Sequence, residues 1–262
     1  MRERLAKRLD EGFPVENTGQ HLAFLLRRHD SDQASKRALL DAAIGITTSN
    51  VYKAAFDEWK AFVRDRGWAS TEVKLVHRLF IGLGEASVLE THVALHRVYG
   101  VPYLPGSSLK GLIKHYAEDL KDQGNDFLNC EQRKWLFGAL DAAGHLDFQD
   151  GWWVPQGEPL NPLCLEVDTP HHMSYHASRG ASLGTDTQHP LASLDREDPN
   201  PVPHLAVQGR FCVSIAGDHF AAHLALAILT RGLASRGLGG RVNVDYGRFE
   251  SPAPSQPLES CE

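Results

Sequence analysis

Apolar residues recur three and four positions apart in several stretches of the chain, which predicts helices there. Residues 1 to about 66 show this spacing, as do residues 107–123 and 218–235, and a shorter helical stretch covers 131–140. In the 107–123 helix the apolar positions are Leu109, Leu112, Ile113 and Tyr116. Asp218 precedes the last helix, where its side chain can cap the free N–H groups of the first turn.

A different pattern, in which apolar and polar residues alternate, predicts strands. It occurs near residues 71–81, 145–154, 204–216 and 241–249. Two more extended pieces are expected, at 163–167 and at 82–98, and the second could pair with the first strand as a hairpin.

Without insertions, the order is strand, helix, strand, strand, helix, strand, which is the ferredoxin-like order. We therefore expect an α+β fold with a ferredoxin-like (RRM-like) βαββαβ core, a helical N-terminal region and a long inserted loop. RNA-recognition modules share this order, although their aromatic signature is not recognisable here. The expected divisions are a helical region at 1–68, a core domain at 69–250 with the insertion near 168–203, and a disordered tail at 251–262.

Composition narrows the class of protein. The 262 residues carry a net charge of −6, which argues against a surface coated in nucleic acid but leaves room for a local basic strip. No run of eighteen apolar residues occurs and the charged N-terminus lacks the apolar segment of a signal peptide, so we expect a cytoplasmic protein without membrane contact. The four cysteines are scattered, which favours reduced thiols over a zinc site or disulfides.

The stretch that precedes the 107–123 helix carries the clearest candidate chemistry. Pro102 and Pro105 hold an extended approach, Gly106 breaks it, and Ser107 or Ser108 can cap the helix. A helix start that also bears Lys110 suits a phosphate, because its N–H groups point outward and its dipole favours negative charge. The Walker spacing is absent, and an ordinary capped helix with a solvated lysine remains the alternative.

A second glycine-bearing bend, G-L-G-G-R at 237–241, follows the last predicted helix. Glycine lets backbone approach backbone closely, so this bend and the helix start at 106 could together form a groove that binds a sugar–phosphate chain without reading bases. The alternative is a helix C-cap followed by a turn.

The inserted loop contains a cluster of histidines. His172 and His176, with Asp168, have spacing that could suit a metal, but Pro170 precedes the pair and no helical pattern supports it. We therefore predict no metal site, and expect a polar loop that packs or contacts RNA.

Three segments resemble the RAMP superfamily of CRISPR proteins: SVLETHVALHRVYGVPYLPGSSLKGLIKHYA, LEVDTPHHMSYH and GLGGRVNVDYGRF. The D-T-P-H-H-x-x-Y element narrows the resemblance to the family of the sixth Cmr subunit of type III-B effector complexes. The similarity covers residues 71–250, whereas the N-terminal helical region matches only loosely.

The resemblance implies a non-catalytic subunit of an antiviral type III-B complex, without cofactor or metal. Such a subunit binds the CRISPR RNA backbone near its 3′ end, caps the subunit filament and meets target RNA through the complex. Its implied protein partners are a neighbouring backbone RAMP, a small helical subunit and another end RAMP. The implied RNA-binding residues are Gly106, Ser107, Ser108, Lys110, Gly111, Lys114, Gly237, Gly239, Gly240 and Arg241, with insertion-loop contacts from His171, His172 and Tyr175.

Other functions stay open at this point. A metal-independent RAMP endoribonuclease that processes CRISPR RNA would use a histidine as acid or base, and His96, His115 and His172 are candidates. Target cleavage by Asp195 or Asp198 of the insertion is a further reading, although the surrounding DRED is more simply a solvated loop. An adaptor without RNA contact would suit the acidic charge.

Overall fold

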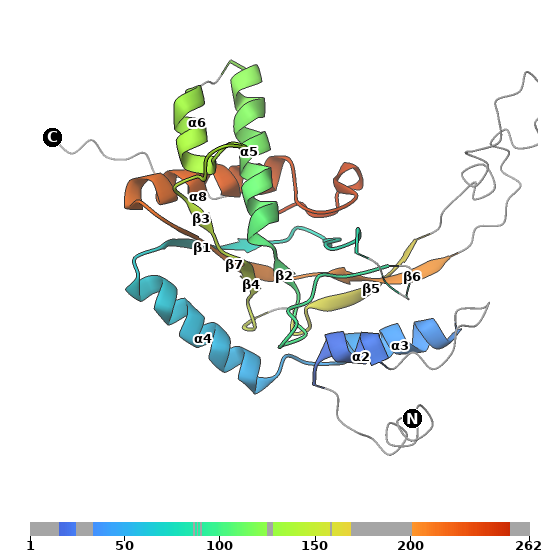
Figure 1. The fold of residues 1–262 in the computed structure, drawn as a ribbon. Helices are drawn as coiled ribbons and strands as arrows, with labels where there is room; N and C mark the ends of the chain where they lie inside the picture. Colours follow the sequence, from blue (N-terminus) through green and yellow to red (C-terminus); the bar gives the residue numbers. More distant parts are fainter. Residues whose placement is uncertain are drawn as a thin grey trace, which may run out of the picture.

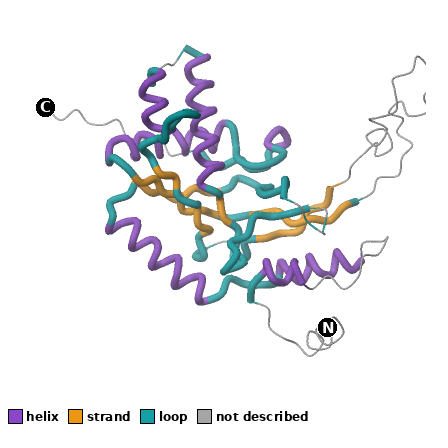
Figure 2. Tube along the Cα trace, viewed as in Figure 1, coloured by secondary structure: helices purple, strands orange, loops and turns teal. Residues whose placement is uncertain are grey.

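The computed structural model of the protein describes residues 16–24, 34–85, 87, 89, 91–124, 128–157, 159–168 and 201–251. Its helices are α2 (Thr18–Phe24), α3 (Ala34–Ile44), α4 (Asn50–Asp65), α5 (Gly106–Asp122), α6 (Cys130–Phe137) and α8 (His219–Ser235), with a 3-10 turn η1 (Val242–Val244). Its strands are β1 (Ala69–Lys74), β2 (Tyr103–Leu104), β3 (Asp147–Phe148), β4 (Gly151–Trp153), β5 (Leu163–Asp168), β6 (Val202–Val207) and β7 (Arg210–Ala216). The strands run through the middle of the molecule with helices on either side (Figure 2).

Strand β7 is the centre of a five-stranded antiparallel sheet with the order β1-β7-β4-β2, in which β3 also pairs with β7. Its residues Phe211 to Ala216 are all buried, as expected for a strand that is covered on both faces. Beyond β1, Leu75 forms an antiparallel bridge with Phe249, and the Glu250 N–H donates to the Lys74 carbonyl at 2.8 Å. The end of the described chain therefore runs along the outer edge of β1.

The two faces of the sheet are covered by different helices (Figure 1). Helices α5 and α8 pack against each other and cover one face, where Phe211, Val213 and Ile215 of β7 are buried. Because successive strand residues point to opposite faces, Cys212 faces the other side, where it meets Phe56 of α4. In the described part of the N-terminal region lie α2, α3 and α4, and α4 closes the second face of the sheet.

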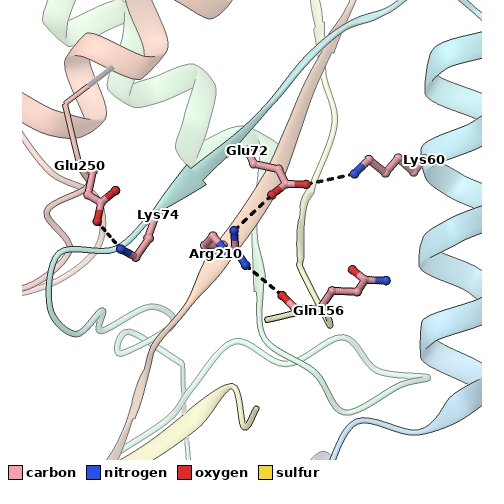
Figure 3. Close-up of polar contacts among 6 residues, drawn as sticks. All are labelled: Lys60, Glu72, Lys74, Gln156, Arg210 and Glu250. Atoms are coloured by element: carbon pink, nitrogen blue, oxygen red, sulfur yellow. Dashed lines mark hydrogen bonds and ion pairs between the residues drawn. The ribbon is translucent and has the colours of Figure 1, made fainter. Parts of the chain in front are cut away.

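Polar contacts fix α4 to the sheet. The Tyr52 hydroxyl donates to the Trp153 carbonyl at 2.6 Å, and this bond is buried. At the other end of the helix, the Lys60 ammonium lies 3.0 Å from the Glu72 carboxylate on β1, which also faces Arg210 of β7 at 4.0 Å (Figure 3). One buried bond and one partly exposed network thus set how α4 lies across the strands.

Strands β5 and β6 form a separate antiparallel hairpin, against which α3 packs. A single strand was expected over 204–216, but the structure divides it into β6 and β7 because Gly209 between them has φ 105°. The Leu79–Val207 bridge connects this hairpin to the segment after β1. Residues 169–200, between the two strands, lie outside the described part of the chain.

Two further expectations were wrong. No named strand forms over the predicted range 241–249. Residues Val242–Val244 are the 3-10 turn η1, because Arg241 and Asp245 on either side of it have φ of 59° and 64°, which an extended strand does not allow, and Phe249 pairs only as a bridge with Leu75. The predicted extended element at 82–98 forms no named strand in its described residues. It is held by the Ala94 N–H, which donates to the Ile81 carbonyl, and by a bridge between Leu95 and Pro102.

The helices expected at 107–123 and 218–235 are confirmed by α5 and α8, and Asp218 caps α8 through the Ala221 N–H at 3.0 Å. Helix α6 ends at Phe137, earlier than expected, because Gly138 has φ 77°. Among the described residues, no helix is both long enough and apolar enough to span a bilayer.

We expect stability to fall as pH is lowered through about 6.5, partly because of His21. Its ring lies 3.0 Å from the Leu39 carbonyl, and burial lowers its pKa below the ordinary 6.5. The unfolded chain then binds a proton that the folded state resists, so stability is lost as pH falls from above 6.5 towards the folded pKa. Melting temperatures of His21→Gln, measured from about pH 8 to about pH 5, should vary less with pH than those of the parent protein. His223→Gln, a change at an exposed position of α8, is the control, and equal slopes for all three proteins would contradict this assignment.

Candidate nucleic-acid interface

Helix α5 begins one residue earlier than the sequence predicted, and neither serine caps it. The N-cap residue is Pro105, whose carbonyl accepts from the N–H groups of Ser108 at 2.9 Å and Leu109 at 3.1 Å, and it makes no side-chain cap. Ser107 and Ser108 lie inside the first turn. The proposed serine cap is therefore wrong, because the two-residue strand β2 already leads Pro105 directly into the helix.

Gly106 is required by packing. A Cβ at this position would overlap the Phe148 carbonyl oxygen of β3, so only glycine lets the helix start this close to the sheet. The Gly106 N–H donates to the Asp150 carboxylate at 2.7 Å. Since a carboxylate already lies at the helix N-terminus, a phosphate would have to bind along the side of α5.

The side of α5 carries two lysines, Lys110 and Lys114. Ser107, Lys110, Gly111 and Lys114 are spaced three and four apart and form one stripe of α5, which we call the α5 stripe. Ser107 and Lys114 are exposed, and Lys110 and Gly111 are half-buried. The opposite side of the helix is buried through Leu109, Leu112, Ile113 and Ala117.

Gly111 has no packing reason to be glycine. Among the residues that the structure describes, no heavy atom lies within 4 Å of the position that its Cβ would occupy, apart from the helix backbone and its chain neighbours. Glycine inside a helix is destabilising by about 0.5–1 kcal/mol relative to alanine. The absence of a side chain leaves the helix backbone open between Lys110 and Lys114, where another molecule could approach closely.

The glycine loop, residues 237–241, is held tightly against the segment after β1. Gly237 and Gly239 have φ of 77° and 86°, and a Cβ on Gly239 would overlap the Phe80 carbonyl oxygen. That carbonyl accepts from the Gly240 N–H at 2.8 Å, and the Leu238 N–H donates to the Gly247 carbonyl at 2.9 Å. Close backbone packing explains these glycines without a ligand.

Rings surround Phe80 beside this loop. The exposed Arg241 places its guanidinium carbon 5.4 Å from the Phe80 ring centroid. Tyr246 and His204 lie on the same ring at centroid distances of 4.4 and 4.7 Å. Arg241 is thus the residue of the glycine loop that can offer a charge to a ligand.

The two predicted segments lie on the same side of the sheet (Figure 1). Arg236, which ends α8 just before the glycine loop, donates to the His115 carbonyl and pairs with Asp119, both on α5. His115 is nine residues beyond Gly106, or roughly 14 Å along the helix. A chain that contacts both segments would follow an extended path past the α5 stripe.

The histidines that the sequence predicted as site residues do not form one site among the described residues. His171, His172 and Tyr175 lie outside the described residues, as do the two insertion aspartates. Of the candidate acid–base histidines, His115 is exposed on α5, 3.5 Å from Glu118, while His96 is half-buried in a cavity. Among the described residues, no cluster of three or more His, Cys, Asp or Glu side chains could hold a metal.

Sequence reasoning missed that cavity, which has a volume of about 250 Å³. It lies between α4, the segment that leads into β2, and β4. Its lining residues are Tyr52, Trp59, His96, Val101, Pro102, Tyr103, Gln149, Asp150 and Trp152. We call it the aromatic cavity. No local motif indicates it, because its rings come from three segments that are distant in the chain.

Burial perturbs the titrating groups of the aromatic cavity. It lowers the pKa of His96 below the ordinary 6.5, although the Asp150 charge acts in the opposite direction. It raises the pKa of Tyr103, and the Asp150 charge adds to that effect. Both side chains are therefore neutral near pH 7, and Val98 donates its N–H to the His96 Nδ1 at 3.3 Å.

The family model described as the RAMP superfamily matches residues 72–250. The chain belongs to the RAMP superfamily. It is 24% identical over 255 aligned residues to the CRISPR system Cmr subunit Cmr6 of Pyrococcus furiosus, covering 76% of this chain and 72% of that protein. It is 23% identical over 212 residues to the Cmr6 subunit of Saccharolobus solfataricus, of which it covers 63%, so it spans less than two thirds of that relative.

A solved structure supports the fold. The chain superposes with a TM-score of 0.62, at 19% identity, on a chain of the cryo-EM structure of the type III-B Cmr-beta bound to cognate target RNA. The superposition covers 83% of this chain and 71% of the other. Membership of the RAMP superfamily and resemblance to Cmr6, both predicted from the motifs, are thereby confirmed.

The two glycines of α5 should respond oppositely to the same substitution. We expect Gly111→Ala to stabilise the fold by about 0.5–1 kcal/mol, because alanine favours the helix and has space. We expect Gly106→Ala to destabilise it by about 2 kcal/mol or more, because its Cβ overlaps the β3 backbone. Urea unfolding of both variants measures the difference, and a destabilised Gly111→Ala would show that a packing reason exists.

Proposed function

We propose that this chain is a non-catalytic subunit of a type III-B CRISPR effector complex. It binds the CRISPR RNA backbone near its 3′ end and caps the subunit filament. Its partners are the CRISPR RNA, a neighbouring backbone RAMP, a small helical subunit and another end RAMP, and it meets target RNA through the complex. The names of its Cmr6 relatives support the assembly.

The proposed scaffold is a ferredoxin-like core. In the order in which they lie side by side, its four strands would be the 249–250 segment, β1, β7 and β4, and each neighbouring pair is antiparallel. Helices α5 and α8 would be the two crossover helices. This is the order of a split βαβ fold. Unlike an RNA-recognition module, however, it has α4 across the second face, so RNA would bind outside the centre of the sheet.

The α5 stripe is the observation that carries the proposal. Two cations flank a glycine whose open backbone no packing explains, on the exposed side of a helix. Ammonium groups contact phosphates, and such contacts position a strand without reading its sequence. Arg241 extends the same path to the glycine loop, and the insertion histidines remain proposed contacts.

An endoribonuclease remains the second candidate, because His96 lies in a cavity beside Asp150 and Tyr103. A histidine of that kind could move protons next to a 2′-hydroxyl. Incubation of the purified chain with CRISPR repeat RNA in EDTA decides between the two. Specific cleavage that His96→Ala abolishes would overturn the non-catalytic proposal.

The binding test uses the α5 stripe. We expect Lys110→Ala with Lys114→Ala to weaken single-stranded RNA binding and to reduce the salt slope by about 1.4, since each lost phosphate contact removes about 0.7. Titrations of labelled RNA at several salt concentrations measure this, together with the CRISPR RNA retained by the assembled complex. Lys121→Ala, an exposed lysine at the end of α5, is the matched control.

Gly111→Ala gives a second and independent readout. If RNA backbone approaches the helix at this glycine, the added methyl should weaken RNA binding while it stabilises the fold. A purely structural role cannot produce both effects together. Retained binding by Gly111→Ala and by the double lysine variant would favour an adaptor without RNA contact.

A further inference from the structure

The aromatic cavity is open at one edge of the sheet, on the face that α4 covers. Five of its lining residues carry rings: Tyr52, Trp59, His96, Tyr103 and Trp152. Tyr52 is fully buried, whereas the other four rings are half-buried. A cavity of about 250 Å³ is smaller than the pockets that hold drug-sized ligands, so it suits a single small ring system.

Three of the rings that line the cavity stack on one another nearly in parallel. Trp152 lies between Trp59, at a centroid distance of 5.3 Å and an angle of 19°, and Tyr52, at 5.8 Å and 18°. His96 contacts the same indole at 5.9 Å. Because Trp59 and Tyr52 already stack on the Trp152 indole, a planar occupant would extend this group of rings by stacking on the ring faces that they leave open.

The polar groups exclude several occupants. The Asp150 carboxylate repels a phosphate, so an RNA strand would enter by a base. Because His96 is neutral and its Nδ1 accepts from Val98, its proton lies on Nε2, where the ring can act as a donor. The cavity therefore offers an occupant the His96 donor and the Asp150 carboxylate acceptor, beside the Tyr103 hydroxyl and the Gln149 amide. A guanidinium or ammonium has no acceptor for the histidine, whereas the edge of a nucleobase presents both kinds of group.

We propose that the aromatic cavity binds one unpaired nucleobase of the bound RNA. This inference rests on the proposed function and adds a base site to the backbone contacts of the α5 stripe. The Asp150 carboxylate connects the two, since it lines the cavity and accepts from the first N–H of α5. A strand that lies along α5 would turn one base over the end of β2 into the cavity. An exocyclic amino group can donate to Asp150, so adenine and cytosine should bind better than uracil.

The test is a double-mutant cycle with RNA. Trp59→Leu keeps an apolar side chain but removes one aromatic ring of the cavity. Phe62→Leu, one turn along α4, is the matched control, because the Phe62 ring packs edge to face against Trp68 instead. The full chain is titrated with single-stranded RNA and with the same RNA carrying one abasic site at each position in turn. We expect one abasic position and Trp59→Leu each to weaken binding roughly 5- to 100-fold, and the two together to weaken it no further.

The outcomes separate the two proposals. Lys110→Ala can weaken RNA binding while Trp59→Leu, and each abasic RNA, leave the affinity of the parent protein for intact RNA unchanged. In that case the base site is wrong and the backbone proposal stands. If the Lys110 and Lys114 variants bind RNA normally, the backbone proposal fails, whatever happens at Trp59. Additive effects of Trp59→Leu and the abasic site would also reject the base site.

A second measurement does not depend on backbone affinity. Indole N–H signals of the full chain are followed by NMR during titration with AMP, CMP, UMP or ribose 5-phosphate at millimolar concentration. We expect the Trp59 and Trp152 signals to move with AMP and CMP, less with UMP, and not with ribose 5-phosphate. Unmoved signals with every nucleotide would overturn the base site. Signals that move with acetyl-arginine amide instead would assign the cavity to a protein partner and also overturn it.

Discussion

Strand β7 is the constraint on which the rest of the structure depends. It must pair its backbone on both edges, with β1 on one side and with β3 and β4 on the other, and it must bury both faces. Helices α5 and α8 cover Phe211, Val213 and Ile215, but Cys212 would face water without α4. The N-terminal helix is thus part of the core, and its Tyr52–Trp153 and Lys60–Glu72 contacts hold it there (Figure 3).

Closing the second face of the sheet determines where a nucleic acid can bind. In a module whose sheet is open, bases stack on the central strands. Here Phe56 and Trp59 occupy that position, so the accessible surfaces are the side of α5, the glycine loop and the rim of the sheet. The same helix supplies Trp59 to the aromatic cavity at that rim. One packing requirement therefore both covers the face that an RNA-recognition module leaves open and supplies a ring to the proposed base site.

Much of the fold could be predicted from the sequence where periodicity is strong. Helices α5 and α8 follow from apolar spacing, and the cap at Asp218 follows from residue type. The end of the chain could not be predicted in this way, because left-handed backbone at Arg241 and Asp245 overrides the alternation that indicated a strand. The cap of α5 depends on Asp150, 44 residues beyond Gly106, and no local pattern reveals such a partner.

For the candidate site, too, part could be predicted from local motifs and part depends on the tertiary structure. The motifs identified the segments at 106–114 and 237–241, but only the structure separates glycines that the fold requires, Gly106 and Gly239, from Gly111, which it does not. The cavity was invisible in the sequence because Trp59, Tyr103 and Trp152 become neighbours only through the sheet and α4.

The β5–β6 hairpin has a consequence for how the family can diverge. Asp168 and Val202 are paired, so the 33 intervening residues leave and rejoin the molecule at one point, and Gly209 turns the chain before β7 begins. Closing a loop becomes only slightly harder as it lengthens, by about 0.6 kcal/mol for each doubling. Evolution can therefore extend, shorten or replace this insertion to meet different neighbours without shifting the register of the central sheet.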